Sequence, residues 1–172
     1  MTGEVAKVIT ATLDERGVEY ERTPTGGFVV TLPGERKQKT LCNLIVGEHA
    51  LRVEAFVMRH PDENREGLYE FLLQRNARMY GVAFSIDPAG DVYLVGRVAL
   101  HSVTPDEIDR LLGAVLEYAD STFNTMLELG FSSAIRREWA WRVKNGESLA
   151  NLHAFAHWAG DASAEPGPPP EA

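Results

Sequence analysis

The 172-residue sequence predicts an α+β fold in which helices pack on an antiparallel sheet, with elements in the order α-β-β-β-β-α-β-β-α-α. Residues 38–58 and 82–100 each contain two runs of alternating apolar and polar residues around a turn, a pattern typical of β-hairpins. One helical pattern lies between these hairpins, and a longer one follows them. Hairpins that are separated by helices favour an antiparallel sheet with helices packed against it.

The first elements are predicted to be a helix and a short hairpin. Apolar residues recur at helical spacing from about residue 3 to residue 16, and Gly17 supplies the left-handed conformation that often ends a helix. Residues 20–23 and 27–32 then flank a Pro-Thr-Gly turn. Two short strands are therefore expected before the first strong hairpin.

The first strong hairpin is predicted over residues 38–46 and 50–58. In its second strand, apolar residues at every other position indicate one buried face. The opposite face becomes apolar toward the end of the strand, at Phe56 and Met58.

The second strong hairpin joins residues 82–86 to residues 92–100. Its turn has the sequence DPAGD, in which proline fixes φ and glycine accepts a positive φ. The two aspartates lack the spacing of the oxygen ligands in a calcium loop, so we predict no metal here.

The helix between the hairpins has apolar residues on two sides. It is predicted to begin with Asp62 as its N-cap and to run to about Arg75. The stripe that faces inward consists of Leu68, Phe71 and Leu72. Tyr69 and Leu73, at i and i+4, form a second strip that needs cover. That cover is either another part of the same chain or a homodimer contact, which would make Tyr69 and Leu73 partner-binding residues.

Further helices are predicted after the second hairpin. The first begins with a capping box, in which Thr104 is the cap and Glu107 reaches back to it. It runs to Gly130, and shorter helices follow over residues 132–144 and 148–158.

Residues 1–158 are predicted to form a single domain. The remaining residues, 159–172, contain four prolines and no large apolar side chain. They cannot bury enough surface to offset their ordering entropy, so we predict a disordered tail.

Composition and charge exclude several classes of partner. Lys and Arg number 17 against 25 Asp and Glu, which gives a formal charge of −8. An acidic surface repels phosphate backbones and anionic lipids, so we predict no nucleic-acid partner and no membrane association. The N-terminus has no basic region followed by an apolar run, and no stretch approaches the ~18 apolar residues of a spanning helix. A single cysteine excludes an intrachain disulfide, and together these features predict a cytoplasmic protein.

The candidate reactive residues do not form a recognisable catalytic or metal-binding set. Cys42 lies in a strand pattern and is interpreted as a small buried hydrophobe. His153 and His157 are at i and i+4 on a helix, but a zinc site needs at least a third ligand. The GFSS sequence at residues 130–133 lacks the Gly-x-Ser-x-Gly pattern of an exposed nucleophile. The sequence therefore predicts no catalytic residue, no metal, no cofactor and no enzymatic activity.

Residues 136–142, RREWAWR, form a basic and aromatic segment in an acidic protein. The line of this helix that is predicted to pack inward consists of Ile135, Trp139 and Val143. Trp141 points elsewhere and shares its side of the helix with Arg137, one turn earlier. Two interpretations stay open: the following helix covers Trp141, or Arg137 and Trp141 are exposed partner-binding residues of the kind enriched at interface hot spots.

Four segments of the sequence stand out together. They are FVMRHPDENREGLYEFLLQRN, MYGVAFSIDPAGDVYLVGR, VTPDEIDRLLGAVLEYADSTFNTMLELGF and IRREWAWR. They resemble the YbjN-domain family, in its actinobacterial branch, and the resemblance extends from residue 5 to about residue 155. It implies a bacterial sensory transduction regulator with a fold similar to type III secretion chaperones, which have an α-β-β-β-α-β-β-α layout, are commonly dimeric and bind other proteins. The family brings no established catalytic residues, and this chain departs from the layout by an extra N-terminal strand and by the helices after Gly130.

Two functions remain open at this point. The first is a non-catalytic, cytoplasmic protein-binding module, chaperone-like or regulatory, which forms a homodimer and holds a segment of an unidentified cytoplasmic protein. The second is a small-ligand-sensing domain or small enzyme with a polar pocket. The residues that would line that pocket are Arg75, Asn76, Asp120 and Asn124. A pocket with converging polar groups would favour the second function, and an exposed apolar patch would favour the first.

Overall fold

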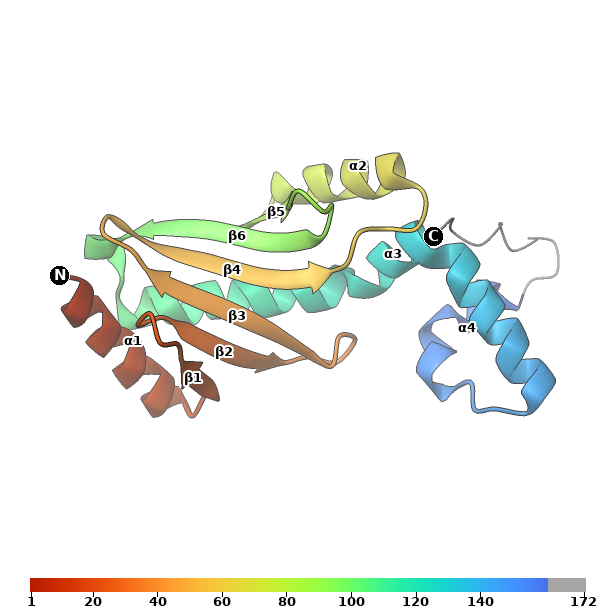
Figure 1. Ribbon diagram of the computed structural model, residues 1–172, viewed down its shortest axis with the longest axis horizontal. Coiled ribbons are helices and arrows are strands. Elements are labelled where there is room, and N and C mark those ends of the chain that lie inside the picture. Colours follow the sequence, from red (N-terminus) through yellow and green to blue (C-terminus); the bar gives the residue numbers. More distant parts are fainter. Residues whose placement is uncertain (161–172) are drawn as a thin grey trace. The chain divides into compact units, whose positions relative to one another are not determined.

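Six antiparallel strands form one sheet in the part of the chain that the structure describes. The computed structural model describes residues 1–160 of the 172. The strands are β1 (Tyr20–Arg22), β2 (Phe28–Pro33), β3 (Lys39–Val46), β4 (Ala50–Met58), β5 (Ala83–Ile86) and β6 (Val92–Ala99). Their order across the sheet is β1-β2-β3-β4-β6-β5, as Figure 1 shows. The predicted hairpins and the α+β class are confirmed.

The helices fall in the predicted order along the chain. They are α1 (Thr2–Arg16), α2 (Arg65–Asn76), α3 (Pro105–Asn145) and α4 (Ala156–Ala159), with 3-10 helices over Leu100–Ser102 and Ala150–Phe155. Gly17, at φ 65°, ends α1 in the left-handed conformation. At the start of α3, the Glu107 N–H donates a hydrogen bond to Thr104 Oγ1 at 3.2 Å, which confirms the predicted cap.

These elements form two compact units. The first consists of Met1–His60 and Phe71–Phe123 and holds the whole sheet. The second consists of Pro61–Glu70 and the described part of Asn124–Ala172. The single domain predicted for residues 1–158 stays a prediction. The predicted tail lies, from residue 161 onward, outside the described residues.

The centre of the first unit is a row of buried side chains that crosses five strands. The antiparallel register aligns Val30, Cys42, Ala55, Leu94 and Phe84. The first four side chains have no solvent exposure, and Phe84 is 6% exposed. Because successive side chains on a strand point to opposite faces, the residues next to this row point to the other face of the sheet. The buried residues that α1 and the first half of α3 add to this unit include Ile9, Leu13, Ile108, Leu111, Val115 and Ala119.

The start of α2 differs from the prediction. The helix begins at Arg65, because Asn64 has a φ of 52°, in the left-handed region, and cannot belong to a right-handed helix. The backbone N–H groups of Asp62 and Glu63 instead donate to the carbonyl oxygen of Gly130, at 3.0 and 3.2 Å. These bonds tie the segment before α2 to the middle of α3, within the second unit.

At that point α3 is kinked. Phe131 has φ −139° and ψ 21°, outside the helical region, close to the boundary that the sequence predicts between two helices. The kink gives the second half of α3 its own N-terminus, and Glu63 caps it. The Glu63 carboxylate accepts hydrogen bonds from the Ser133 N–H at 2.7 Å and from the hydroxyls of Ser132 and Ser133 at 3.1 Å each.

The helix predicted over residues 148–158 forms only in part. Ala150–Phe155 is a 3-10 helix, and α4 covers only the four residues Ala156–Ala159. We call residues 148–160, which follow α3 and pack against it, the returning segment. Its tertiary contacts explain the difference. The indole N–H of Trp158 donates to the Glu128 carboxylate at 3.3 Å, so packing against α3 decides the local geometry.

Loss of the Glu63 cap should destabilise the protein. We expect Glu63→Ala to lower the free energy of unfolding by about 2 kcal/mol, because it removes a charged acceptor of several hydrogen bonds. Urea denaturation followed by circular dichroism measures this. Glu63→Gln keeps one acceptor oxygen and should cost less than half as much. Equal losses in the two variants would contradict a capping role.

Candidate functional site

One face of the sheet is open in the first unit. Leu41 and Phe56 are 42% and 41% exposed, and Tyr93 is half-buried. Phe56 and Tyr93 are register partners on β4 and β6, and their rings meet edge to face with centroids 5.5 Å apart. We call Leu41, Phe56 and Tyr93 the open sheet face. Clusters of large, solvent-exposed apolar side chains are typical of interaction surfaces.

The other end of the same face is charged. Arg52 lies opposite Arg97 across the pairing of β4 with β6, and it forms an ion pair with Glu54 at 2.8 Å. Ion pairs between such exposed side chains contribute little to stability. The face thus has an apolar end beside a polar end, and apolar centres next to polar rims are typical of protein interfaces.

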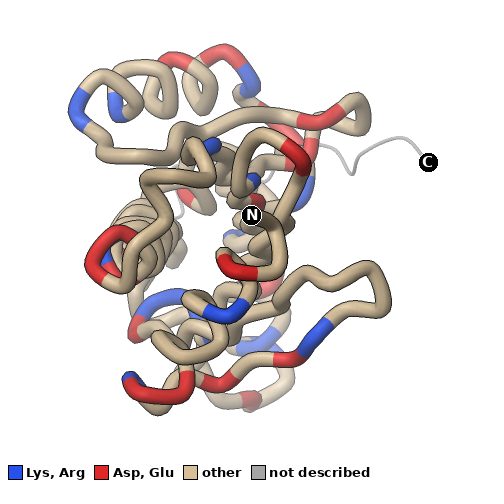
Figure 2. Tube along the Cα trace, turned by 90° about the vertical axis from the view of Figure 1, so that its left-hand side faces the viewer, with Lys and Arg blue, Asp and Glu red and all other residues tan. Residues whose placement is uncertain are grey.

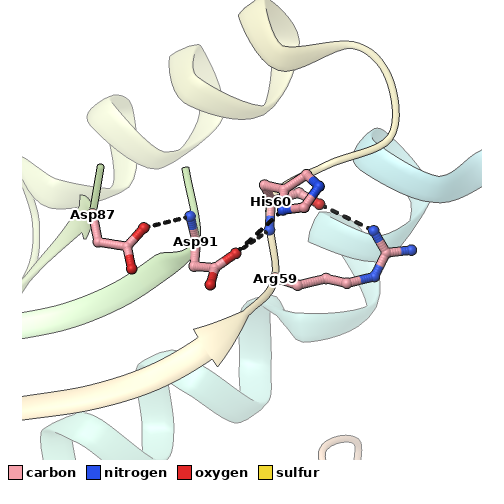
Figure 3. Close-up of polar contacts among 4 residues, drawn as sticks. All are labelled: Arg59, His60, Asp87 and Asp91. Carbon is pink, nitrogen blue, oxygen red and sulfur yellow. Dashed lines mark hydrogen bonds and ion pairs between the residues drawn. The ribbon is translucent and has the colours of Figure 1, made fainter. Parts of the chain in front are cut away.

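Two aspartates hold the apolar end of this face in place (Figure 3). Asp87 Oδ1 accepts a hydrogen bond from the Asp91 N–H at 2.9 Å, within the turn between β5 and β6. Asp91 Oδ1 accepts one from the His60 N–H at 2.8 Å, just past the end of β4. The guanidinium of Arg59 donates to the His60 carbonyl oxygen at 3.3 Å. Asp91 therefore anchors the chain that leaves β4 against the neighbouring turn.

The end of α3 exposes large apolar side chains in the second unit. Trp141 is 54% exposed and Val143 is 59% exposed. Of the line that the sequence predicts to face inward, Ile135 is buried, but the prediction is wrong for Val143. The segment that follows α3 contacts it at Arg142, whose guanidinium donates to the Ser148 carbonyl oxygen at 2.8 Å, and at Glu128, and it leaves Trp141 and Val143 exposed. The interpretation in which a following helix covers Trp141 therefore does not hold for the described residues.

The two other tryptophans have structural contacts. The Arg136 guanidinium lies 5.1 Å from the centre of the Trp158 ring. A Cβ on Gly160 would lie 3.0 Å from the indole nitrogen of Trp139, so glycine lets the chain pass close to that ring. Trp139 and Trp158 thus hold the returning segment, whereas Trp141 faces solvent. We call Trp141, with the basic residues Arg137 and Lys144 one turn before and one turn after it, the Trp141 patch.

The strip on α2 is exposed at one of its two predicted positions. Leu73 is 68% exposed, and Tyr69 is half-buried. On the predicted inward stripe, Leu68 and Leu72 are buried and Phe71 is half-buried. Leu73 is therefore the most exposed apolar residue of a helix whose other large apolar side chains are buried or half-buried.

Two of the polar residues proposed for a ligand pocket, Asn76 and Asp120, instead bind backbone groups in different parts of the fold. The Asn76 side chain accepts from the Phe84 N–H at 2.7 Å and donates to the Phe84 carbonyl oxygen at 3.1 Å, on the edge strand β5. Asp120 Oδ1 accepts from the N–H groups of Arg36 and Lys37, at 2.8 and 2.9 Å, in the turn between β2 and β3. These anchors lie on strands far apart in the sheet order, so the structure does not bring Asn76 and Asp120 together.

The other two members of that set have separate surroundings. The Arg75 guanidinium lies 5.2 Å from the centre of the Phe71 ring, one turn earlier on α2. Asn124 is half-buried in the second unit. A sequence pattern of polar residues at helical spacing does not reveal which of them bind the backbone of another element.

A pocket of about 240 Å³ lies among α1, β2 and α3 in the first unit. Its lining is mainly apolar and contains none of the four polar residues above. Arg16 and Asp109 form an ion pair at its edge, with Arg16 Nε 3.8 Å from Asp109 Oδ1. The apolar side chains that line it are Leu13, Val18, Leu32, Ile108, Leu112 and Leu116.

The reactive side chains considered in the sequence do not form a site in the described residues. Cys42 has no solvent exposure, and burial raises the pKa of its thiol to about 12. His157 lies 4.0 Å from a Glu128 oxygen. Among residues 1–160, no group of three or more His, Cys, Asp and Glu side chains is placed to hold a metal ion. Cys42 is therefore a neutral core residue at physiological pH.

Charged residues of both signs are spread along the described part of the chain. Figure 2 shows acidic and basic residues mixed along the trace in that view. Phosphate backbones are bound by gathered Lys and Arg side chains. Within the described part of the chain, no helix is both long and apolar enough to cross a membrane.

The fold is that of the type III secretion chaperones. The Yersinia pestis type III secretion chaperone SycH, in complex with a stable fragment of YscM2, matches with a TM-score of 0.53 at 15% identity, over 69% of this chain and 98% of that chain. A chain of the ExsC–ExsE complex matches with a TM-score of 0.54 at 18% identity, over 73% and 96%. The heterodimeric ExoU–SpcU complex of Pseudomonas aeruginosa gives 0.52 at 19% identity, over 70% and 98%. At these identities the likeness concerns the fold alone.

The chain belongs to the YbjN family. The family, described as "Putative bacterial sensory transduction regulator", matches residues 6–128. The uncharacterized protein Rv0487 of Mycobacterium tuberculosis is 56% identical over 158 residues, which cover 89% of this chain and 86% of that protein. The uncharacterized protein ML2442 of Mycobacterium leprae is 57% identical over 145 residues, covering 83% and 79%. The resemblance and the chaperone-like fold predicted from the sequence are confirmed.

The open sheet face was only partly visible in the sequence. The sequence shows the apolar end of one strand at Phe56, but Leu41 and Tyr93 belong to other strands. Their place beside Phe56 depends on which strands pair and in which register. The alternation in β3 and β6 was the available signal, and it does not by itself identify the neighbours.

Substitutions at two adjacent positions of β4 test the exposure of this face. Phe56→Ala should lower the free energy of unfolding by about 1 kcal/mol, because the ring is 41% exposed. Val57→Ala removes fewer atoms but should cost about 2 kcal/mol, since Val57 is 1% exposed and its loss leaves a cavity. Urea denaturation of both variants gives the comparison. The opposite order would place Phe56 in the core.

Proposed function

We propose that this protein is a non-catalytic, cytoplasmic protein-binding module, chaperone-like or regulatory, that acts as a homodimer and holds a segment of another cytoplasmic protein. The observation that carries the proposal is the Trp141 patch. Trp141 is 54% exposed, which leaves a large apolar side chain in water without a benefit to folding. Association with a partner would remove that cost.

The chemistry of the patch fits a protein partner. Tryptophan and arginine are the residues most enriched at interface hot spots, because they combine large apolar area with directed polar contacts. Residues 136–144 contain four Lys and Arg against one Glu, a local net charge of +3 in a chain of −8. The proposed contact residues here are Arg137 and Trp141. A partner segment with apolar and acidic side chains would match them.

The proposal that the protein is not an enzyme rests on the use of its reactive groups. The Cys42 thiol is buried and neutral, and Asp87 and Asp91 hold a turn. Asn76 and Asp120 bind backbone groups of other elements. Side chains that are committed to hold the fold are poorly placed to carry out turnover.

The similar structures support a protein-binding function by analogy. SycH was solved with a fragment of YscM2, and the ExsC–ExsE and ExoU–SpcU structures are complexes of two proteins. Fold analogy alone does not give function. The exposed apolar residues of this chain are the independent support.

A second candidate is the sensing of a small ligand. The pocket of about 240 Å³ among α1, β2 and α3 favours it, and its mainly apolar lining would take an apolar ligand. Arg75, Asn76, Asp120 and Asn124, the polar residues proposed from the sequence for this function, do not line this pocket. A small molecule that raises the melting temperature without changing contacts at Trp141 would favour this candidate.

Photo-crosslinking tests the proposed partner site. With p-benzoyl-phenylalanine in place of Trp141, we expect one non-self protein to be crosslinked in cells at least about fivefold more than from the same substitution at Glu117, an exposed residue of the same helix. The purified partner should then bind Trp141→Ala about 10–30-fold more weakly than the native chain, a loss typical of one hot-spot residue. Equal crosslinking from the two positions would overturn the assignment of this patch.

Charged substitutions on α2 test the homodimer. Tyr69→Glu with Leu73→Glu should shift the mass measured by light scattering from dimer toward monomer at ~100 μM, since charge at an apolar contact must be desolvated. Ala77→Glu adds a charge at an exposed position just past the end of α2 and should leave the mass unchanged. A native chain that is monomeric at that concentration would refute the dimer. A double variant that loses its cooperative melt would place Tyr69 and Leu73 in the interior of one chain.

A further inference from the structure

We propose that the pocket among α1, β2 and α3 binds a small, uncharged, apolar molecule of about ten non-hydrogen atoms. The proposal gives the second candidate function a ligand class and rests on that function. It needs no protein partner. The residues that line the pocket all belong to the first unit.

The floor of the pocket is built from core side chains. Ile108 and Leu112 lie one turn apart on α3 and are 1% and 7% exposed. Leu13 of α1 and Leu32 of β2 are 1% and 6% exposed. Because the close packing of three elements holds these four side chains, the floor keeps its shape without a ligand. An apolar floor of this kind favours a ligand that removes water from it.

The polar side chains at the pocket already have partners. Thr12 is 3% exposed, and its hydroxyl donates to the Val8 carbonyl oxygen of the same helix at 2.7 Å. At the edge Arg16 pairs with Asp109, so the two charges offset each other. Thr12, Arg16 and Asp109 are the polar side chains of the lining. A charged ligand would lose hydration here without gaining an unpaired group to bind, which favours an uncharged one.

Gly113 leaves the mouth of the pocket open. It lies in the interior of α3, where glycine is a poor helix former. A Cβ at this position would meet no atom within 4 Å, and the φ of Gly113 is outside the left-handed region. Neither packing nor backbone geometry therefore requires glycine here. Since Gly113 is exposed and lines the pocket, a larger side chain would stand at its mouth.

The volume of the pocket sets the size of the ligand. It is about 240 Å³. An apolar protein cavity of roughly 150 Å³ holds one benzene molecule, so each non-hydrogen atom needs about 25 Å³. On this scale the pocket accommodates about ten such atoms, the size of two fused rings.

The experiment titrates the full chain, labelled with ¹⁵N, with indole, an uncharged molecule of two fused rings. Amide chemical shifts locate the binding site, and their saturation gives the Kd. The blocking variant is Gly113→Leu. The matched control is Gly3→Leu, because Gly3 also lies in a helix, α1, and a Cβ there would also meet no atom within 4 Å. Leucine is a better helix former than glycine, so both variants should melt no lower than the native chain.

We expect indole to shift the amide signals around the pocket, that of Gly113 among them, with a Kd on the order of 1 mM. Gly113→Leu should weaken binding at least about tenfold, because its side chain stands in the mouth, and Gly3→Leu should leave the Kd unchanged. Indole-3-acetate has the same rings with a carboxylate. It should bind at least about threefold more weakly than indole, because the carboxylate meets an arginine that is already paired.

Three results would overturn the proposed site. One is the absence of saturable shifts in the native chain up to about 10 mM indole. Another is equal binding by the native chain and Gly113→Leu, which would place the indole elsewhere. A third is a melting temperature of Gly113→Leu below that of the native chain, which would mean that position 113 is not open.

A fourth result would overturn the ligand class alone. If indole-3-acetate bound more tightly than indole, the pocket would take anions, and the second candidate function would stand without this ligand class. The test uses only the purified chain and two small molecules. Its failure is therefore distinguishable from a failure of the crosslinking at Trp141, which tests the protein-binding function.

Discussion

A shift of one residue in the pairing of β4 with β6 would exchange the core of the first unit with its surface. In the observed register Ala55 faces Leu94 in the buried row, and Phe56 faces Tyr93 on the open sheet face. The same strands therefore supply both the interior and a candidate interaction surface, and only the register separates the two. Polar side chains bind the backbone beside these strands. Asp91 fixes the chain that leaves β4, and Asn76 pairs with the backbone of β5.

Local patterns were sufficient for most elements of this fold. The cap at Thr104 and the left-handed Gly17 obey rules that operate within a few residues, and the structure contains both. The elements that differ depend on distant contacts. α2 starts late because the amides before it bond to Gly130, which is far away in sequence. The 3-10 geometry of Ala150–Phe155 follows from packing against α3, which no local pattern encodes.

The residue types of the candidate site could be predicted from the sequence, but the solvent exposure of each side chain could not. The sequence showed an Arg/Trp segment, but three tryptophans look equivalent in a sequence. Their roles separate only when the returning segment is placed, since it contacts Trp139 and contributes Trp158. Trp141 is 54% exposed, because the contacts of that segment fall on other residues of α3. The polar set failed to converge for a related reason: the pattern at i and i+4 on α3 was visible, but the attachment of Asp120 to the turn between β2 and β3 was not.

The buried thiol of Cys42 has a practical consequence for the study of this protein. The chain has a single cysteine, and burial raises the pKa of its thiol to about 12. At neutral pH the thiol is therefore protonated and unreactive, in addition to the steric protection of the core. Any cysteine introduced on the surface would be the dominant target of maleimide or disulfide reagents. Fluorophores, spin labels or crosslinkers can thus be attached at chosen positions while the native residue, and the sheet around it, stays intact.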